Sequence, residues 1–427
     1  MSLSIQTVQN YTAILREELI PAMGCTEPIA IAYAASLLRD ALGALPEELV
    51  AGFSGNIIKN VKSVVVPMTD GGRGIEVAMA AGLFANAHDR CLEVLSGLDD
   101  DGRRAIPKYL SEVRPLVERL ESDLVFEIRL FGRAGGHEAT VHMTERHTHI
   151  EKITLDGKEI TSRYRRESNG APVKETDRSV LSVEGILAFV EEPMTEELKM
   201  LLRRQITMNL AIAEEGLKTD WGASIGKVIY ADGTCSLRDR ARAYAAAASD
   251  ARMSGCELPV CILSGSGNQG ITASVPVAVY AREMGVSEDA MLRAVLLSDL
   301  ITIHQKTGIG CLSAYCGAIS AGCGCGCGIC YLHGGGFREV AHTLVNSVAI
   351  LSGTICDGAK SSCAAKIAMA VEAGILGYEM FCKGHQFYGG DGIVTKGVEN
   401  TIRNVGRLAR EGMSETDRSI IHMMLEN

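Results

Sequence analysis

The sequence has few aromatic residues and no apolar stretch long enough to cross a membrane. A single Trp is present, and aromatic residues make up 5% of the 427 positions. A membrane-spanning helix needs about 18 or more apolar residues in a row, and no such run free of charged residues occurs. We therefore expect no association with a membrane.

Basic charge is also in deficit, because 42 Lys and Arg residues stand against 52 Asp and Glu residues. The net charge of −10 argues against nucleic acid as a partner, since phosphates require a basic protein surface. The acidic residues are spread along the chain, which indicates solubility more than one particular partner.

A secretion signal is lacking too. Residues 1–18 contain no basic head followed by an apolar segment, so we expect a protein of the cytoplasm, a reducing compartment. In that compartment, 14 cysteines indicate metal or redox chemistry rather than disulfides. An isolated cysteine is more often a small buried hydrophobic residue. That interpretation applies to Cys91, Cys235, Cys256, Cys261 and Cys382.

The apolar pattern changes along the chain and predicts three segments, in keeping with a length that suits two domains or one domain with a large insertion. Residues 1–45 show helical spacing and are expected to pack on the C-terminal domain. Residues 46–177 mix strand and helix signals, whereas residues 178–427 are largely helical. The predicted fold class is α+β: a largely helical catalytic domain, with a smaller α+β domain inserted after the N-terminal helices.

Several elements of the smaller domain can be predicted. Residues 64–66 are expected to form a short strand, and alternating apolar residues over 126–155 predict further strands. Asp156-Gly157 is typical of a hairpin turn. The predicted helices of this domain cover residues 74–83 and 108–120.

Capping residues mark helices in the C-terminal segment. Thr195 and Ser287 each precede a stretch with apolar residues at helical spacing, so each is expected to be an N-cap. Ser414 with Asp417 resembles a capping box for the last helix.

A Gly-Cys-Thr-Glu-Pro turn at residues 24–28 opens the second predicted helix. Cys25 and Thr26 are expected at the helix N-terminus, where the helix dipole favours anions and lowers the pKa of a thiol. The turn therefore predicts a reactive thiolate at Cys25. The alternative is an ordinary helix start that happens to contain a cysteine.

Two polar loops are candidates for holding a carboxylate. Residues 54–62 place Asn56 and Lys59 before a predicted strand, and they form either an anion site or an ordinary loop. Residues 265–270 match GxGxxG, but no alternating βαβ series surrounds them and Pro276 is expected to interrupt the following helix. We therefore favour an anion-binding loop over a dinucleotide fold. Its residues are Ser266, Gly267, Asn268, Gln269 and Gly270.

Four histidines lie close together in the smaller domain: His137, His142, His147 and His149. His147 and His149 would share one face of a strand, which invites a zinc site. No carboxylate or cysteine completes a recognisable ligand spacing, however. Polar histidines on the solvent side of a sheet are the favoured interpretation.

Eight of the 14 cysteines lie between residues 306 and 365. Those in the run 323–330 are separated mainly by single glycines, which suits small packing residues in a helix better than a metal clip. The stronger set of ligands comprises Cys316, Cys356 and Cys363. Three thiolates can bind three irons of a [4Fe-4S] cluster and leave the fourth iron open as a Lewis acid.

The Gly-Cys-Thr-Glu-Pro turn, the loop 265–270 and the segment Cys356-Asp-Gly-Ala-Lys-Ser-Ser-Cys363 together resemble the L-cysteine desulfidase family, which is related to the iron–sulfur L-serine dehydratases. The resemblance implies an oxygen-sensitive [4Fe-4S] cluster on Cys316, Cys356 and Cys363. It also implies that Cys25 works beside the cluster, as a base or as a displaceable fourth ligand. The implied reaction converts L-cysteine and water to sulfide, ammonia and pyruvate by α,β-elimination, without pyridoxal phosphate.

A small amino-acid substrate is thus expected, with its carboxylate on the 266–270 loop. Asn56 and Lys59 are expected to help, and Thr26 and Glu27 to lie beside it. Two alternatives stay open: a dehydratase of L-serine or another β-substituted amino acid, and a non-catalytic iron–sulfur or thiol sensor. The glycine-rich helical surface is also compatible with a homodimer.

Overall fold

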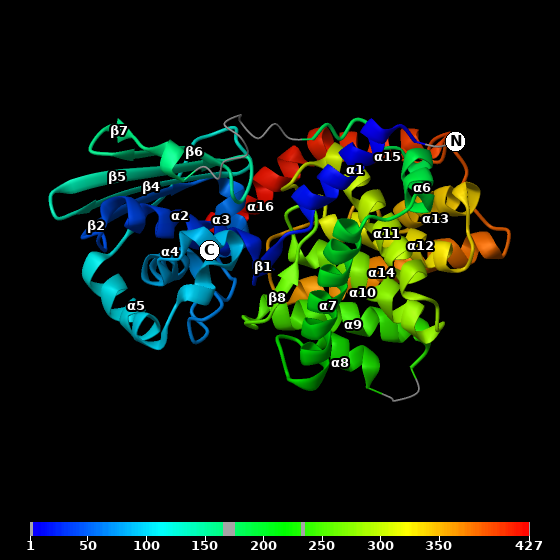
Figure 1. Ribbon diagram of the computed structural model, residues 1–427, viewed down its shortest axis with the longest axis horizontal. Helices are drawn as coiled ribbons and strands as arrows, with labels where there is room; N and C mark the ends of the chain where they lie inside the picture. The colour runs from blue at the N-terminus through cyan, green and yellow to red at the C-terminus, as the bar shows by residue number, and fades with distance from the viewer. Residues whose placement is uncertain (1–2, 165–175, 232–234, 427) are drawn as a thin grey trace.

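The computed structural model describes residues 3–164, 176–231 and 235–426. These residues form a smaller α+β part and a larger helical part that meet side by side (Figure 1). This arrangement confirms the predicted α+β fold class with a helical majority. No helix among the described residues combines the length and the apolar character needed to cross a bilayer.

The smaller part is built on one six-stranded sheet with the order β3-β2-β4-β5-β6-β7. β2 and β3 are parallel, and the other neighbours are antiparallel. Helix α2 packs against β4, β5 and α4, so it covers one face of the sheet. The elements are α2 (Thr26–Leu42), β2 (Glu48–Phe53), α3 (Gly55–Val61), α4 (Gly74–Ala85), η1 (His88–Gly97), α5 (Asp100–Val113), β3 (Leu116–Arg119), β4 (Glu127–Ala134), β5 (His137–Thr144), β6 (Ile150–Leu155), β7 (Lys158–Glu159) and η2 (Thr161–Arg163).

Residues 1–45 do not behave as one segment. Helix α1 (Ile5–Glu18) packs on the helical part, where Tyr11 lies edge-on to Phe189, and strand β1 (Pro21–Met23) pairs there with β8. Helix α2 belongs to the sheet instead. The expectation that all 45 residues pack on the C-terminal domain is therefore wrong for α2, whose nearly all-round apolar surface is buried between the sheet and α4.

The strands predicted over 126–155 and the hairpin at Asp156-Gly157 are confirmed, since β6 pairs with β7 across that turn. Residues 64–66 form only an isolated bridge, because Pro67 removes the next N–H donor. The helix predicted over 108–120 ends at Val113: Arg114 is left-handed with φ 49°, Pro115 follows, and β3 begins.

The helical part surrounds helix α12, which packs against α10, α11, α13 and α14. Its elements are α6 (Val183–Glu191), α7 (Glu196–Lys218), α8 (Ile225–Tyr230), α9 (Leu237–Met253), β8 (Pro259–Cys261), α10 (Gly267–Glu283), α11 (Glu288–Ile309), α12 (Gly317–Leu332), α13 (Phe337–Leu351), α14 (Ser362–Cys382), α15 (Val398–Arg407), η3 (Leu408–Gly412) and α16 (Ser414–Glu426). Helix α16 returns to the smaller part and packs on α3 (Figure 1).

Two of the predicted caps are confirmed. The hydroxyls of Thr195 and Ser287 accept hydrogen bonds from backbone N–H groups in the first turns of α7 and α11. The capping box predicted at Ser414 is wrong, because the Ser414 hydroxyl donates to the carbonyl of Glu411 and Asp417 pairs with Lys59 of α3. Helix α10 also continues through Pro276, which corrects the predicted interruption, because its burial on all sides holds the helix together.

The glycines of α12 explain the cysteine run at residues 323–330. Gly322 lies against the backbone of Ala370, and Gly326 lies against that of Gly374, both in α14. Because the contacts advance along both helices in the same direction, α12 and α14 run parallel and begin at the same end. The cysteines of this run are all buried, which supports the packing interpretation: Cys323, Cys325, Cys327 and Cys330.

The approach of α12 to α14 yields a stability prediction. A Cβ at Gly374 would overlap the carbonyl oxygen of Gly322, so Gly374→Ala should lower the free energy of unfolding by about 1–3 kcal/mol. The matched control is Met369→Ala, at a half-exposed position of the same helix, which should change it by less than about 0.5 kcal/mol. Urea denaturation measures both, and equal effects would contradict the packing argument.

Candidate active site

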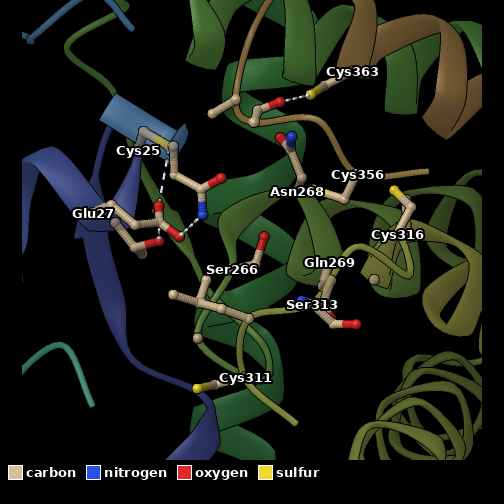
Figure 2. A pocket seen from close by; sticks show the side chains of 18 of the residues that line it. Cys25, Glu27, Ser266, Asn268, Gln269, Cys311, Ser313, Cys316, Cys356 and Cys363 are labelled. Carbon is tan, nitrogen blue, oxygen red and sulfur yellow. Dashed lines mark hydrogen bonds between the residues drawn. The ribbon is translucent and has the colours of Figure 1, made fainter. Parts of the chain in front are cut away.

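A cavity of about 100 Å³ lies where the two parts of the protein meet. Its wall is formed by the start of α2 from the smaller part and by helix starts and loops of the helical part. Figure 2 shows Cys316 and Cys356 side by side, across the cavity from Cys25 and Glu27. Five cysteines line this space, all as free thiols: Cys25, Cys311, Cys316, Cys356 and Cys363.

Four helices begin at the cavity wall. Cys25 is the N-cap of α2, Cys316 the N-cap of α12, and Ser266 the N-cap of α10. Cys363 is the second residue of α14. Helix N-termini carry partial positive charge and free N–H groups, so the cavity favours anions such as thiolates and carboxylates.

A short backbone ladder holds Cys316 next to Cys356. The N–H of Cys316 donates to the carbonyl of Thr354 at 3.0 Å, and the N–H of Cys356 donates to the carbonyl of Ala314 at 2.7 Å. The two thiols are neighbours and interact with each other. This contact lowers the pKa of Cys356, helped by the charges of Lys59 and Lys366, and raises the pKa of Cys316.

The segment between Cys356 and Cys363 is folded tightly against α3 and α14. Gly358 has φ 97° and lies against the carbonyl of Lys59, so only glycine fits there. Asp357 forms ion pairs with Lys360 of the segment and with Lys366 of α14. Cys363 then enters α14 with its thiol 3.8 Å from the carbonyl oxygen of Gly358.

Asn56 and Lys59 do not line this cavity, which corrects their predicted role in binding the substrate. Asn56 lines a separate hollow beside α16. Lys59 is buried, pairs with Asp417 at 2.5 Å, and reaches the carbonyl of Cys356 at 3.5 Å. The ion pair thus joins α3 and α16 behind the Cys356 loop. Asn60, one residue further on, does line the cavity and donates to Glu27 Oε1 at 3.1 Å.

The predicted anion loop reaches the cavity. Ser266, Asn268 and Gln269 line it, while Gly267 and Gly270 allow the start of α10 to pack closely on its neighbours. The preceding strand β8 has three residues and pairs antiparallel with β1. A dinucleotide fold requires a parallel βαβ unit there, so the interpretation as an anion loop is supported.

The environment of Cys25 contradicts the expected thiolate. Its thiol is buried and donates to Glu27 Oε2 at 3.4 Å, and the Thr26 hydroxyl donates to the same oxygen at 3.1 Å. Burial, followed by the negative charge of Glu27, raises the pKa of Cys25 well above its usual range. The position at a helix start was predicted, but burial of the thiol and the carboxylate two residues later together outweigh the helix dipole.

His147, which the sequence analysis assigned to the solvent side of a sheet, is instead buried beside Glu27. It lies in the turn between β5 and β6, not on a strand, and its Nε2 is 3.8 Å from Glu27 Oε1. Burial by itself raises the pKa of Glu27, but His147 outweighs it and the pKa is lowered. His147 also packs edge-on against Phe126, with ring centroids 5.0 Å apart. No sequence spacing links position 147 to position 27.

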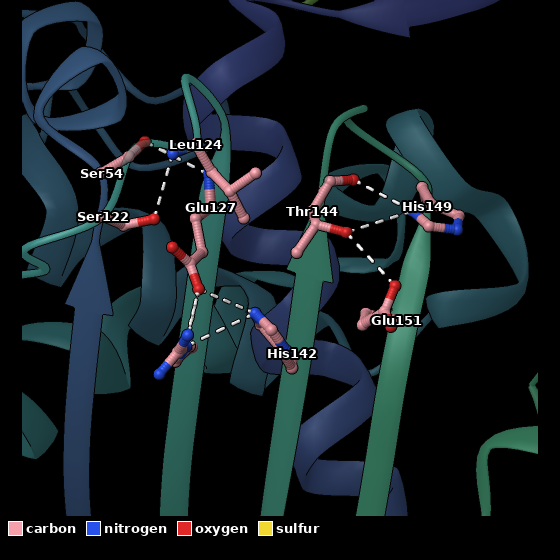
Figure 3. A network of polar contacts seen from close by, with 9 residues as sticks. Ser54, Ser122, Leu124, Glu127, His142, Thr144, His149 and Glu151 are labelled. Carbon is pink, nitrogen blue, oxygen red and sulfur yellow. Dashed lines mark hydrogen bonds and ion pairs between the residues drawn. The ribbon is translucent and has the colours of Figure 1, made fainter.

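The other three histidines make polar contacts within the sheet region, as favoured from the sequence. His137 pairs with Asp156, and His142 with Glu127. His149 contacts Thr144 (Figure 3). Within residues 3–164, 176–231 and 235–426, no three His, Cys, Asp or Glu side chains are grouped as ligands of one metal ion.

A cubane iron–sulfur cluster does not require its protein ligands to converge on one metal ion. Each thiolate binds its own iron, so the cysteine sulfurs are spaced around the cluster. Cys316, Cys356 and Cys363 share one cavity, which suits that arrangement. The wall also carries Arg252 and Lys306, both buried, whose positive charges would balance thiolates. The donor set and its surroundings therefore fit an iron–sulfur cluster.

The thiol pair yields a reactivity prediction for the cluster-free protein. Because the pKa of Cys356 is lowered and that of Cys25 is raised, Cys356 should be alkylated by iodoacetamide at pH 7 much faster than Cys25. Peptide mass spectrometry over time measures both rates. In Cys316→Ala, the pH profile of Cys356 alkylation should move to higher pH, because the neighbouring thiol donor is gone. Equal rates at Cys25 and Cys356 would contradict the assignment.

Comparison with known proteins gives one family and several close relatives. The sequence pattern of the serine dehydratase alpha chain matches residues 136–422. A UPF0597 protein of Desulfitobacterium hafniense is 52% identical, over 98% of this chain and 96% of its own length. UPF0597 proteins of Treponema denticola and Lachnoclostridium phytofermentans are 42% and 44% identical, over 100% and 96% of this chain and 100% and 98% of their own lengths.

Proposed function

Because this chain belongs to the family of the serine dehydratase alpha chain, we propose that it is an iron–sulfur lyase acting on a small β-substituted α-amino acid. The observation that carries the proposal is the single cavity shared by Cys316, Cys356 and Cys363 at the foot of parallel helices. With L-cysteine and water the products are sulfide, ammonia and pyruvate. The family match favours L-serine as a second substrate, which would give ammonia and pyruvate.

Cys316, Cys356 and Cys363 would hold the [4Fe-4S] cluster. When bound, such a cluster supplies one open iron, a Lewis acid that draws electrons from the β-substituent and helps it leave. The protein's own contribution is to hold the thiols apart on rigid elements. Cys316 and Cys363 start two packed helices, and Cys356 is tied to them by the backbone ladder.

The substrate is oriented by the start of α10 in this proposal. Free N–H groups at this helix N-terminus suit the α-carboxylate. Gln269 Oε1 is buried and lacks a hydrogen-bond partner among the described residues, so it can accept a hydrogen bond from the α-ammonium group. Pyridoxal phosphate has no part in this scheme.

The α-proton needs an acceptor, and Cys25 is poorly suited because its thiol remains protonated at neutral pH. The Glu27–His147 pair takes this role instead: Glu27 faces the cavity and His147 stands behind it. The imidazole can hold the proton while the carboxylate stabilises the resulting cation. Loss of the proton and the β-substituent leaves an aminoacrylate, which water converts to pyruvate and ammonia.

The lyase proposal is tested by anaerobic reconstitution with iron and sulfide, followed by assays of pyruvate and sulfide from L-cysteine and of pyruvate from L-serine. We expect turnover with at least one of the two substrates and its loss in Cys356→Ala. The control Cys382→Ala changes an exposed cysteine outside the cavity and should keep full activity. A wild-type protein that carries a cluster and turns over neither substrate would favour the sensor function.

The proton acceptor is tested by a second set of variants. His147→Gln and Glu27→Gln should each lower kcat by about 10²–10⁴-fold, the usual contribution of general base catalysis, while the iron content stays unchanged. His149→Gln is the matched control, because His149 contacts Thr144 in the sheet and should leave kcat intact. Full activity in His147→Gln together with inactivity in Cys25→Ser would return the role of base to Cys25.

A further inference from the structure

Arg252 is a buried cation with one edge free of partners. It lies at the end of α9 and is 2% exposed. Its Nη1 donates to Asn268 Oδ1 at 3.1 Å, whereas Nε and Nη2 have no hydrogen-bond partner among the described residues. Burying a charged donor without a partner is costly, so an unmet donor pair of this kind indicates a missing acceptor.

Arg252 is part of the cavity wall. Its guanidinium lies so close to Gly267 that any side chain at that position would overlap Nε. Gly267 is the first residue of α10, so the guanidinium meets the positive end of that helix. Two sources of positive charge therefore converge on one point of the wall.

Asn268 orients Arg252. The Asn268 Oδ1 accepts from Arg252 and from the Ser249 hydroxyl at 3.3 Å, and its Nδ2 contacts the sulfur of Met253. These contacts occupy the amide that the sequence assigned to the substrate. They also fix the guanidinium so that Nε and Nη2 remain as an adjacent, roughly parallel pair of donors.

The chemistry of that pair identifies the acceptor. Adjacent guanidinium N–H groups match the two oxygens of a carboxylate in a bidentate pair. A thiolate or sulfide offers a single large atom that accepts hydrogen bonds weakly, so it does not match two adjacent N–H donors. Glu27 supplies charge nearby but makes no hydrogen bond to Arg252 among the described contacts.

We propose that Arg252 is the receptor for the α-carboxylate, which its Nε and Nη2 bind against the start of α10, so that the site accepts free amino acids and discriminates against amides and peptides. This inference rests on the proposed function for the identity of the substrate. It adds the residue that selects for a free α-carboxylate.

The test is equilibrium binding, by calorimetry, of L-alanine and L-alaninamide, and of L-2-aminobutyrate and L-2-aminobutyramide, to anaerobically reconstituted protein. None of these compounds has a leaving group on the β-carbon, so the proposed reaction does not consume them. The wild type should bind at least one of the two acids about tenfold or more tighter than its amide. Arg252→Gln should weaken binding of the acid by about 10²–10³-fold and bring the acid-to-amide ratio near one, because truncating one partner of a buried charged pair has an effect of this size. The control is Arg240→Gln, in the same helix as Arg252, which removes a surface ion pair with Glu283 of α10. Its binding of acid and amide should match the wild type.

Two further variants separate a loss of the carboxylate site from a loss of the fold or the cluster. The iron content of each variant reports whether the cluster is retained. Arg252→Lys keeps the charge without the two adjacent N–H donors and should lose about tenfold in acid binding. Gly267→Ala should weaken acid binding by displacing the guanidinium. An unchanged acid-to-amide ratio in Arg252→Lys and Arg252→Gln would overturn the proposal, as would a wild type that does not prefer the acids. If the preference for acids depends on Arg252 but no pyruvate is formed from L-cysteine or L-serine, the carboxylate-binding role of Arg252 stands and the proposed lyase activity is rejected.

Discussion

The site depends on the close approach of α12 to α14. Glycines at 322, 326 and 374 bring the two backbones into contact, and the helices run parallel. Their first turns therefore open at the same place, with Cys316 at one start and Cys363 at the other. Residues far apart in the sequence thus meet because two packed helices share an end, and the cysteines inside α12 serve this packing.

Charge balance is the second constraint. The cavity wall gathers helix N-termini and the cations Arg252, Lys306 and Lys366, while Lys59 acts from behind the Cys356 loop. The pKa values of two cysteines in this cavity shift in opposite directions. Cys356 lies among cations beside another thiol, and its pKa falls; Cys25 lies beside a buried carboxylate, and its pKa rises. Both parts of the protein are needed, because Glu27 and His147 come from the smaller one.

The sequence predicted the fold class, most helices and strands, and the cysteines that share the cavity, because periodicity, caps and turn residues act locally. It could not show that α2 packs on the sheet, since that depends on tertiary contact. His147 was assigned to the solvent side of a sheet and Arg252 was missed for the same reason: each matters through one distant neighbour, Glu27 or Gly267. The thiolate predicted at Cys25 failed because a local rule about helix dipoles ignores burial.

The central claim is that Cys316, Cys356 and Cys363 together hold one cluster with an open iron. Mössbauer spectroscopy of anaerobically reconstituted protein, with and without bound amino acid, tests it most directly. The account predicts about four irons per chain in one cubane, one of which changes its signal when the amino acid binds. A cluster that persists when all three cysteines are replaced by alanine, or four irons whose signals are all unchanged by the amino acid, would contradict it.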